Sequence, residues 1–194
     1  MPPRFDAAAL GHLRELLARR PAVEIVAPQH RRAAVLLPLV RDDDGEYSLV
    51  FSRRADTLAA HSGQIAFPGG SVEPGETLEA AVIREAEEEV GIPSASVELI
   101  GRLDDLITNS GFLVAPYCGL VYERVEYVMQ QSEVAEVFEV PIAALLDERQ
   151  PEVRYVPFRK KRYPAYFYRY RDYEIWGLTG RIVKEFLDLV WMAV

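Results

Sequence analysis

Three segments of the chain place apolar residues at the three- and four-residue intervals of an amphipathic helix. The first begins after Asp6, a residue type that caps helices, carries leucines on one face and stops at Pro21. The second spans Thr77 to Val90, and the third spans about Leu178 to Met192. We expect helices at all three places and a shorter one in "PIAALLD".

Shorter apolar runs bounded by Gly, Pro and Asp predict strands. They cover residues 33–40, 46–54, 64–70, 96–107, 112–122 and 134–140, and an aromatic hairpin is expected over 153–175. Strands and helices do not alternate regularly, which indicates a mixed sheet flanked by helices. We therefore predict an α/β (α+β) fold in one domain over residues 1–194, with residues 1–30 as an N-terminal helical extension.

Composition narrows the class of protein. A hydrophobic content of 49% in 194 residues is enough for a sizeable core. The formal net charge of −8 argues against nucleic acid or anionic membrane as a partner, since their phosphates would be repelled. No run approaches the ~18 apolar residues of a membrane span, and the start has no signal-peptide core. With one cysteine, Cys118, no internal disulfide forms. We predict a cytoplasmic protein and leave its oligomeric state open.

The second helix carries four glutamates in the five positions from Glu85 to Glu89. At about 100° per residue, Glu85, Glu88 and Glu89 converge beside the apolar stripe, whereas Glu87 points away. Such like charges repel, and the repulsion grows where water is partly excluded. A solvated acidic face is the simpler interpretation. The position beside the buried stripe instead favours a site for a hard divalent cation, Mg²⁺ or Mn²⁺.

The segment before this helix, "FPGGSVEPGE", adds glycines where backbone passes close to a ligand, and a further carboxylate at Glu76. A cation held by carboxylates beside a glycine-rich loop suits phosphate chemistry, because it screens phosphate charge and activates a water. An acidic site then accepts an anionic substrate that brings metal ions with it. The pattern predicts metal-dependent hydrolysis of a phosphate compound.

Gly70, Glu76 and the run "REAEEEVGI" from Arg84 to Ile92 match the fixed positions of the Nudix box. The chain therefore resembles the Nudix family. This resemblance implies an α/β/α sandwich and Mg²⁺-dependent hydrolysis of a nucleoside diphosphate linked to another moiety, with Mn²⁺ able to substitute. It also implies that Arg84 orients a box glutamate and that Glu87 fills a variable slot. The metal ligands implied by the resemblance are Glu85, Glu88, Glu89 and Gly70.

Residues 51–70, "FSRRADTLAAHSGQIAFPGG", are similar to the segment that precedes the box in coenzyme A diphosphatases, a Nudix subfamily. The likeness extends over nearly the whole chain after the first helix. It implies hydrolysis of CoA or a CoA derivative to 3′,5′-ADP and 4′-phosphopantetheine, or acyl-phosphopantetheine. Ala59 stands where the subfamily has an arginine. The alternatives are ADP-ribose, NADH or a dinucleoside polyphosphate as substrate, or a nucleotide-binding module without turnover.

Other side chains are candidates for contact with a small nucleotide substrate: Arg53, Arg54, His61, Gln64, Gly69, Gly70 and Phe112. Arg54 is favoured for a substrate phosphate because a guanidinium binds phosphate bidentately; a surface ion pair is the alternative for both arginines. Glu133 is the candidate catalytic base or additional metal ligand, and Glu136 is the second choice. Basic and aromatic residues interleave over 154–171, which predicts the packed face of a hairpin rather than a nucleic-acid platform.

Overall fold

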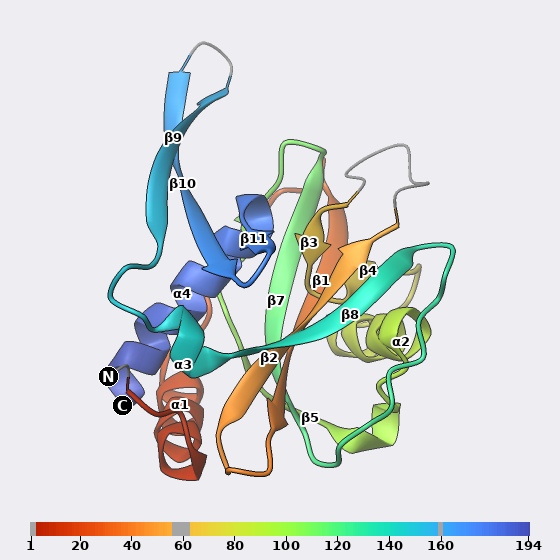
Figure 1. Ribbon diagram of the computed structural model, residues 1–194. Helices are drawn as coiled ribbons and strands as arrows, with labels where there is room; N and C mark the ends of the chain where they lie inside the picture. Colours follow the sequence, from red (N-terminus) through yellow and green to blue (C-terminus); the bar gives the residue numbers. More distant parts are fainter. Residues whose placement is uncertain (1–2, 56–62, 159–160) are drawn as a thin grey trace.

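The computed structural model describes residues 3–55, 63–158 and 161–194. Their main sheet has the strand order β3-β2-β1-β7-β5, with β4 beside β1, β6 beside β7 and β8 beside β2 (Figure 1). The central strands β1 and β7 are parallel over ten residue pairs, and the other pairings are antiparallel. The predicted mixed sheet is confirmed.

The main sheet is built from strands of very unequal length. They are β1 (Arg31–Arg41), β2 (Tyr47–Arg54), β3 (Ile65–Ala66), β4 (Gly69–Ser71), β5 (Val97–Arg102), β6 (Leu106–Ile107), β7 (Phe112–Val121) and β8 (Val134–Pro141). The helices are α1 (Ala7–Arg19), α2 (Leu78–Val90), the short α3 (Ile142–Leu145) and α4 (Gly177–Ala193), and a 3-10 turn, η1, spans Ser94–Ser96.

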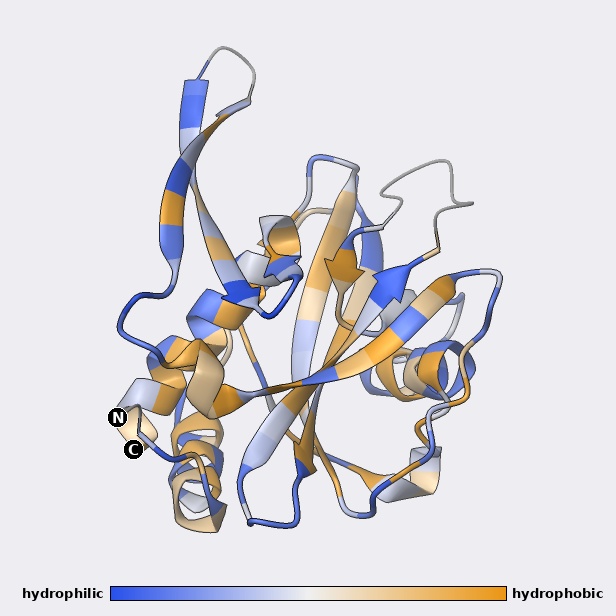
Figure 2. Cartoon of the chain, in the orientation of Figure 1, coloured by the Kyte–Doolittle hydropathy of each residue, from blue (hydrophilic) through white to orange (hydrophobic). Residues whose placement is uncertain are grey.

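The helices cover both faces of the sheet, which makes the predicted α/β/α sandwich. Leu37 and Leu39 of β1 pack in one cluster with α1 and α4, whereas Ala34 and Leu36 pack in a second cluster with α2. Successive residues of a strand point to opposite faces. The almost continuous apolar run of β1, visible as orange ribbon in the centre of the sheet in Figure 2, is therefore buried on both sides.

Local signals explain where the helices begin and end. Asp6 caps α1, since its carboxylate accepts hydrogen bonds from two backbone N–H groups of the first turn. Thr77 caps α2 through its hydroxyl, which accepts a hydrogen bond from the backbone N–H of Ala80. Gly91, at a φ of 72°, ends α2 in the left-handed conformation that glycine adopts without strain. Within the described residues, no helix is long and apolar enough to cross a membrane.

Two predicted elements differ from the structure. The strand expected over 96–107 is interrupted: η1 precedes β5, and a break separates β5 from β6. Gly101 has a φ of 154° at a register shift in β5, and β5 ends at the next residue, Arg102, whose side chain pairs with Asp105 in the break. The short strand expected to run into a Pro-Gly-Gly break within 64–70 is β3, but the two glycines of that break themselves begin a second strand, β4; β3 pairs with β2 and β4 with β1.

The aromatic hairpin forms a separate three-stranded sheet of β9 (Glu152–Phe158), β10 (Lys161–Tyr170) and β11 (Tyr173–Ile175), and its outer part projects from the body (Figure 1). The expected packed aromatic face is correct only at its base. Phe167 and Tyr168 are buried, whereas Tyr155 and Tyr163 are 58% and 46% exposed. The aromatic alternation continues beyond the part of the hairpin that the body covers.

Candidate active site

The glycine pair of β4 lies directly against the sheet and α2. A Cβ atom on Gly69 would come within 2.3 Å of the carbonyl oxygen of Ala34, and one on Gly70 would come within 2.5 Å of the carboxylate of Glu85. Both distances are shorter than side chains tolerate. Glycine is therefore favoured at both positions by the neighbouring protein atoms, and the close approach of this backbone to a ligand stays a prediction.

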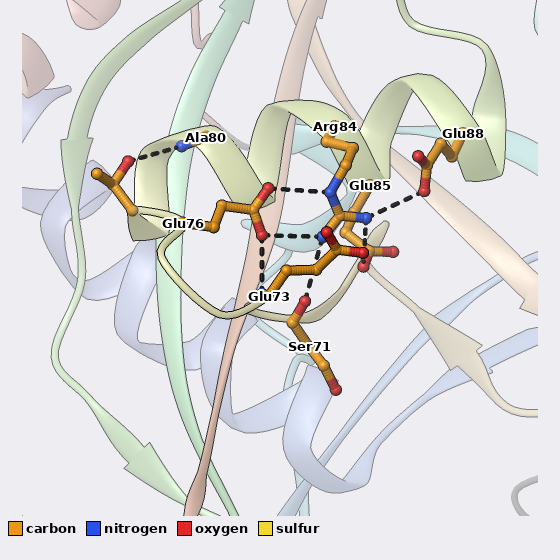
Figure 3. Close-up of polar contacts among 8 residues, drawn as sticks. Ser71, Glu73, Glu76, Ala80, Arg84, Glu85 and Glu88 are labelled. Carbon is orange, nitrogen blue, oxygen red and sulfur yellow. Dashed lines mark hydrogen bonds and ion pairs between the residues drawn. The ribbon is translucent and has the colours of Figure 1, made fainter.

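Arg84 gathers the carboxylates at the exposed end of this site (Figure 3). Its guanidinium donates to both carboxylate oxygens of Glu76, at 2.9 and 3.1 Å, and to the carbonyl of Ser71 at 3.2 Å. It also donates to Glu85 and Glu88, each at 3.0 Å. These hydrogen bonds raise the pKa of Arg84, those with Glu76 most strongly. Arg84 is thus placed to align two of the three converging glutamates.

Glu89 lies deeper than the other glutamates, with 6% of its surface exposed. Its carboxylate accepts a hydrogen bond of 2.9 Å from the backbone N–H of Gly69. Burial raises the pKa of Glu89 to about 7, and the negative charges of Glu85 and Glu133 act in the same direction. Burial likewise raises the pKa of Glu85. Glu87 is exposed, as the helical wheel predicts.

Two charged residues outside the box act electrostatically on its glutamates. The charge of Arg54 lowers the pKa of Glu89, and the charge of Glu133 raises the pKa of both Glu85 and Glu89. The end of β2 lies beside the start of β8, because the backbone N–H of Ala55 donates to the carbonyl of Glu133 at 2.8 Å.

The remaining predicted residues lie elsewhere. Arg53 and Glu136 form an ion pair of 3.2 Å with each other. Phe112, at the start of β7, lies under the guanidinium of Arg31 at 4.4 Å. Gln64 follows the segment 56–62 and accepts a backbone hydrogen bond from Arg54 through its carbonyl. His61 and Ala59 lie outside the described residues.

Within the described residues, no group of three or more His, Cys, Asp or Glu side chains is arranged to hold a metal ion, and Glu85 and Glu88 are hydrogen-bonded to Arg84. The donor set nevertheless fits a hard divalent cation. It is all oxygen, it includes a buried carboxylate with a raised pKa, and Gly70 leaves room where a Cβ would displace Glu85. A bound cation would offset the negative charge that burial makes costly.

Fold and site together define an α/β/α domain with an acidic, oxygen-only site between a glycine strand and a helix. The family profile described as NUDIX domain matches residues 30–166. The chain belongs to the Nudix family, whose hydrolases cleave diphosphate linkages and generally use divalent metal ions such as Mg²⁺.

The sequences of relatives can be matched over most of the chain. A Photorhabdus laumondii protein described as an uncharacterized Nudix hydrolase, NudL, is 37% identical over 171 residues, covering 88% of this chain and 90% of its own. A Cronobacter sakazakii protein of the same description is 38% identical over 167 residues, covering 86% of each. In fold, the chain is similar to RenU, a Nudix hydrolase from M. smegmatis, with a TM-score of 0.52, 23% identity and coverage of 61% and 74%.

The sequence alone did not predict one group of interacting side chains. Tyr173 of β11 donates to Glu136 of β8 at 2.6 Å, so the second-choice base is held by both Tyr173 and Arg53. The only signal in the sequence was the aromatic run over 154–171, which ends two residues earlier. The pairing depends on which strand β11 lies against, and no local pattern encodes that.

Proposed function

We propose that the protein hydrolyses the diphosphate linkage of coenzyme A or a CoA derivative, with Mg²⁺ or Mn²⁺, to 3′,5′-ADP and 4′-phosphopantetheine or its acyl form. The assignment of CoA as the substrate rests on the similarity of residues 51–70 to the segment that precedes the box in CoA diphosphatases. The chemistry rests on Nudix membership and on the oxygen-only site described above.

Glu85 and Glu89 would hold the cation, with Glu88 at the exposed rim and the backbone of Gly70 beside them. When bound, the cation screens the charge of the diphosphate and activates the attacking water. Arg84 positions Glu85 and Glu88 through its paired hydrogen bonds. Removal of one of these carboxylates disturbs the others, because they share the same guanidinium.

Two residues outside the box complete the proposal. Glu133, whose charge acts on both Glu85 and Glu89, would accept the proton of the attacking water. Glu136 is less suited to that role, since Arg53 and Tyr173 already bind its carboxylate. Arg54, whose charge acts on Glu89, would bind a substrate phosphate with its planar, bidentate guanidinium. Its neighbour Arg53 is directed away by the alternation of the strand.

The decisive measurement is kcat/KM for CoA, dephospho-CoA, ADP-ribose, NADH and a dinucleoside polyphosphate, each with Mg²⁺ and with Mn²⁺. We expect CoA or a CoA derivative to lead. A kcat/KM for ADP-ribose or NADH at least tenfold above that for CoA would contradict CoA as the substrate. It would still support hydrolysis of a diphosphate linkage. Nucleotide binding without hydrolysis under either metal would contradict turnover altogether.

A further inference from the structure

A pocket lies at the end of β2, on the face of the sheet opposite the box glutamates. Its volume is about 530 Å³, and it is lined by Arg53, Glu136, Arg171, Asp172 and Tyr173. Arg53 and Arg54 are successive residues, so their side chains leave β2 on opposite faces. The pairing of β2 with β8 shifts register between them. This pocket and the box glutamates therefore flank the same strand end.

One aromatic ring, that of Tyr173, lines the pocket and is held in place by its neighbours. Tyr173 stacks on Phe138, with ring centroids 3.8 Å apart and an interplanar angle of 6°. Phe138 stacks in turn on Phe51 at 5.9 Å, and Phe51 on Phe67 at 4.6 Å. The hydroxyl of Tyr173 donates to Glu136 at 2.6 Å, which also fixes the ring in its plane. Tyr173 itself is half-buried and lines the pocket, so part of its side chain is accessible there.

The charges in the pocket decide which chemical group it fits. The formal charges of Arg53 and Arg171 are balanced by those of Glu136 and Asp172. A phosphate placed here would face two carboxylates as well as two guanidinium groups. A neutral ring with both donors and acceptors meets no such repulsion, and it finds acceptors in the carboxylates and donors in the arginines. The pocket suits a polar aromatic ring better than an anion.

The turn at the rim of the pocket holds Arg171 and Asp172. Arg171 has a φ of 52° because it is the first residue of the two-residue turn that joins β10 and β11. It is exposed, and its guanidinium lies over the ring of Tyr170, 5.1 Å from the ring centroid. The turn therefore brings the charges of Arg171 and Asp172 to the edge of the pocket.

We infer that this pocket binds the adenine base of the substrate. The base stacks on Tyr173, its exocyclic amino group donates to the carboxylate of Asp172, and a ring nitrogen accepts from an arginine. The inference rests on the proposed function in one respect: the nucleotide half of the substrate would pass around the end of β2 toward Glu85 and Glu89. Tyr173 is then a residue that determines specificity for the base.

The test is equilibrium binding of 5′-AMP to the full chain in EDTA, by calorimetry, with ribose 5-phosphate as the ligand that lacks the base. We expect saturable binding of AMP and at least tenfold weaker binding of ribose 5-phosphate. Tyr173→Leu should weaken AMP binding about tenfold or more. Tyr173→Phe keeps the stacking ring and should stay within about threefold of the wild type. Tyr155→Leu, on the exposed part of β9, is the matched control and should bind AMP normally.

Equal affinity for AMP and ribose 5-phosphate would overturn the inference, as would normal AMP binding by a folded Tyr173→Leu variant. Nuclear Overhauser contacts between the base protons and the Tyr173 ring, measured on the wild type, provide a test that does not depend on the variant folding; their absence in the AMP complex would also overturn it. Tyr173-dependent AMP binding without hydrolysis of CoA would reject the proposed function alone. Hydrolysis of CoA with Tyr173-independent AMP binding would reject this pocket alone.

Discussion

The candidate active site and the pocket beneath β11 differ in how the chain builds them. In the active site, Arg84 and Glu76 are eight residues apart, and Gly69 and Glu89 are twenty apart. In the pocket, Arg53 and Glu136 are 83 residues apart, and Tyr173 and Glu136 are 37 apart. One helix and one short strand bring these box residues together, whereas the pocket requires β2, β8 and β11 to be assembled. The box is therefore encoded locally, whereas the pocket depends on tertiary structure.

The largest effect should come from the buried glutamate. Glu89→Gln keeps the size of the side chain and an oxygen that accepts the hydrogen bond of Gly69, but it removes the negative charge. We expect kcat/KM under saturating Mg²⁺ to fall by about 100-fold or more, since the charge stabilisation supplied by a metal ion is worth several kcal/mol. Steady-state kinetics and circular dichroism on the same preparation measure activity and folding together.

Glu87→Gln is the matched control, because Glu87 belongs to the same helix and is exposed. Its kcat/KM should remain within about twofold of the wild type, as for a surface substitution away from any special contact. Near-normal turnover by the Glu89 variant would remove Glu89 from the proposed metal ligands. A similar loss in both variants would mean that the acidic character of the helix, and not the position of Glu89, supports activity.

Gly70→Ala tests the contact between the strand and the helix. The added Cβ would lie 2.5 Å from the carboxylate of Glu85, the far end of a flexible side chain that moves at little cost. We expect kcat/KM to fall roughly 10–100-fold, as when groups that orient metal ligands are disturbed, with little change in the free energy of unfolding. Gly11→Ala, in α1 with no atom within 4 Å of the new Cβ, should leave activity unchanged. Equal activity in both variants would contradict the role of this close approach.

The same contrast explains what the sequence could predict. The helix predicted over Thr77 to Val90 is observed as α2 over Leu78–Val90, and the signals that define it, its apolar stripe, the cap at Thr77 and the end at Gly91, are all local. The exposed position of Glu87 followed from the helical period alone. The mixed sheet was predicted from irregular alternation, but its strand order was not, because the parallel pairing of β1 with β7 joins segments about 80 residues apart. Tyr173 could not be assigned for the same reason: its partner Glu136 becomes a neighbour only after β8 and β11 have docked.

The pH dependence of stability should distinguish the buried glutamate from its surroundings. The pKa of Glu89 is about 7 in the folded protein, above the ordinary value of 4.5 that applies to the unfolded chain. The folded state therefore holds the proton longer, and stability conferred by the protonated form is complete below about pH 4.5. It is lost as pH rises through 7, by at most roughly 3 kcal/mol. Denaturant titrations in EDTA at a series of pH values measure this loss.

Glu89→Gln has no proton to lose at this position, so the difference in unfolding free energy between variant and wild type should grow from pH 4.5 to 7 in favour of the variant. Taking the difference cancels groups that titrate in both proteins. A difference that stays constant with pH would show that Glu89 keeps an ordinary pKa in the absence of metal. A difference of opposite sign would show that the charged form is favoured by the fold.

The smallest effect should come from Arg53. Its ion pair with Glu136 is 38% and 37% exposed at the two side chains, and pairs of this kind contribute about 0–1 kcal/mol to stability. Arg53→Ala should therefore lower the free energy of unfolding by less than about 1 kcal/mol. The kcat of this variant should be unchanged, because the Arg53 side chain lies on the face away from the box glutamates. Only the KM of an adenine-containing substrate should rise, by a few-fold, through loss of one hydrogen bond to the base.

Arg54→Ala, one residue further along β2, should reduce kcat/KM by more than tenfold, since a charge-assisted contact to phosphate is worth about 1.5–3 kcal/mol. Steady-state kinetics on the two variants measure both effects. Equal losses in kcat would mean that both arginines act on the reacting phosphates, and the division of β2 into a chemical face and a recognition face would be wrong.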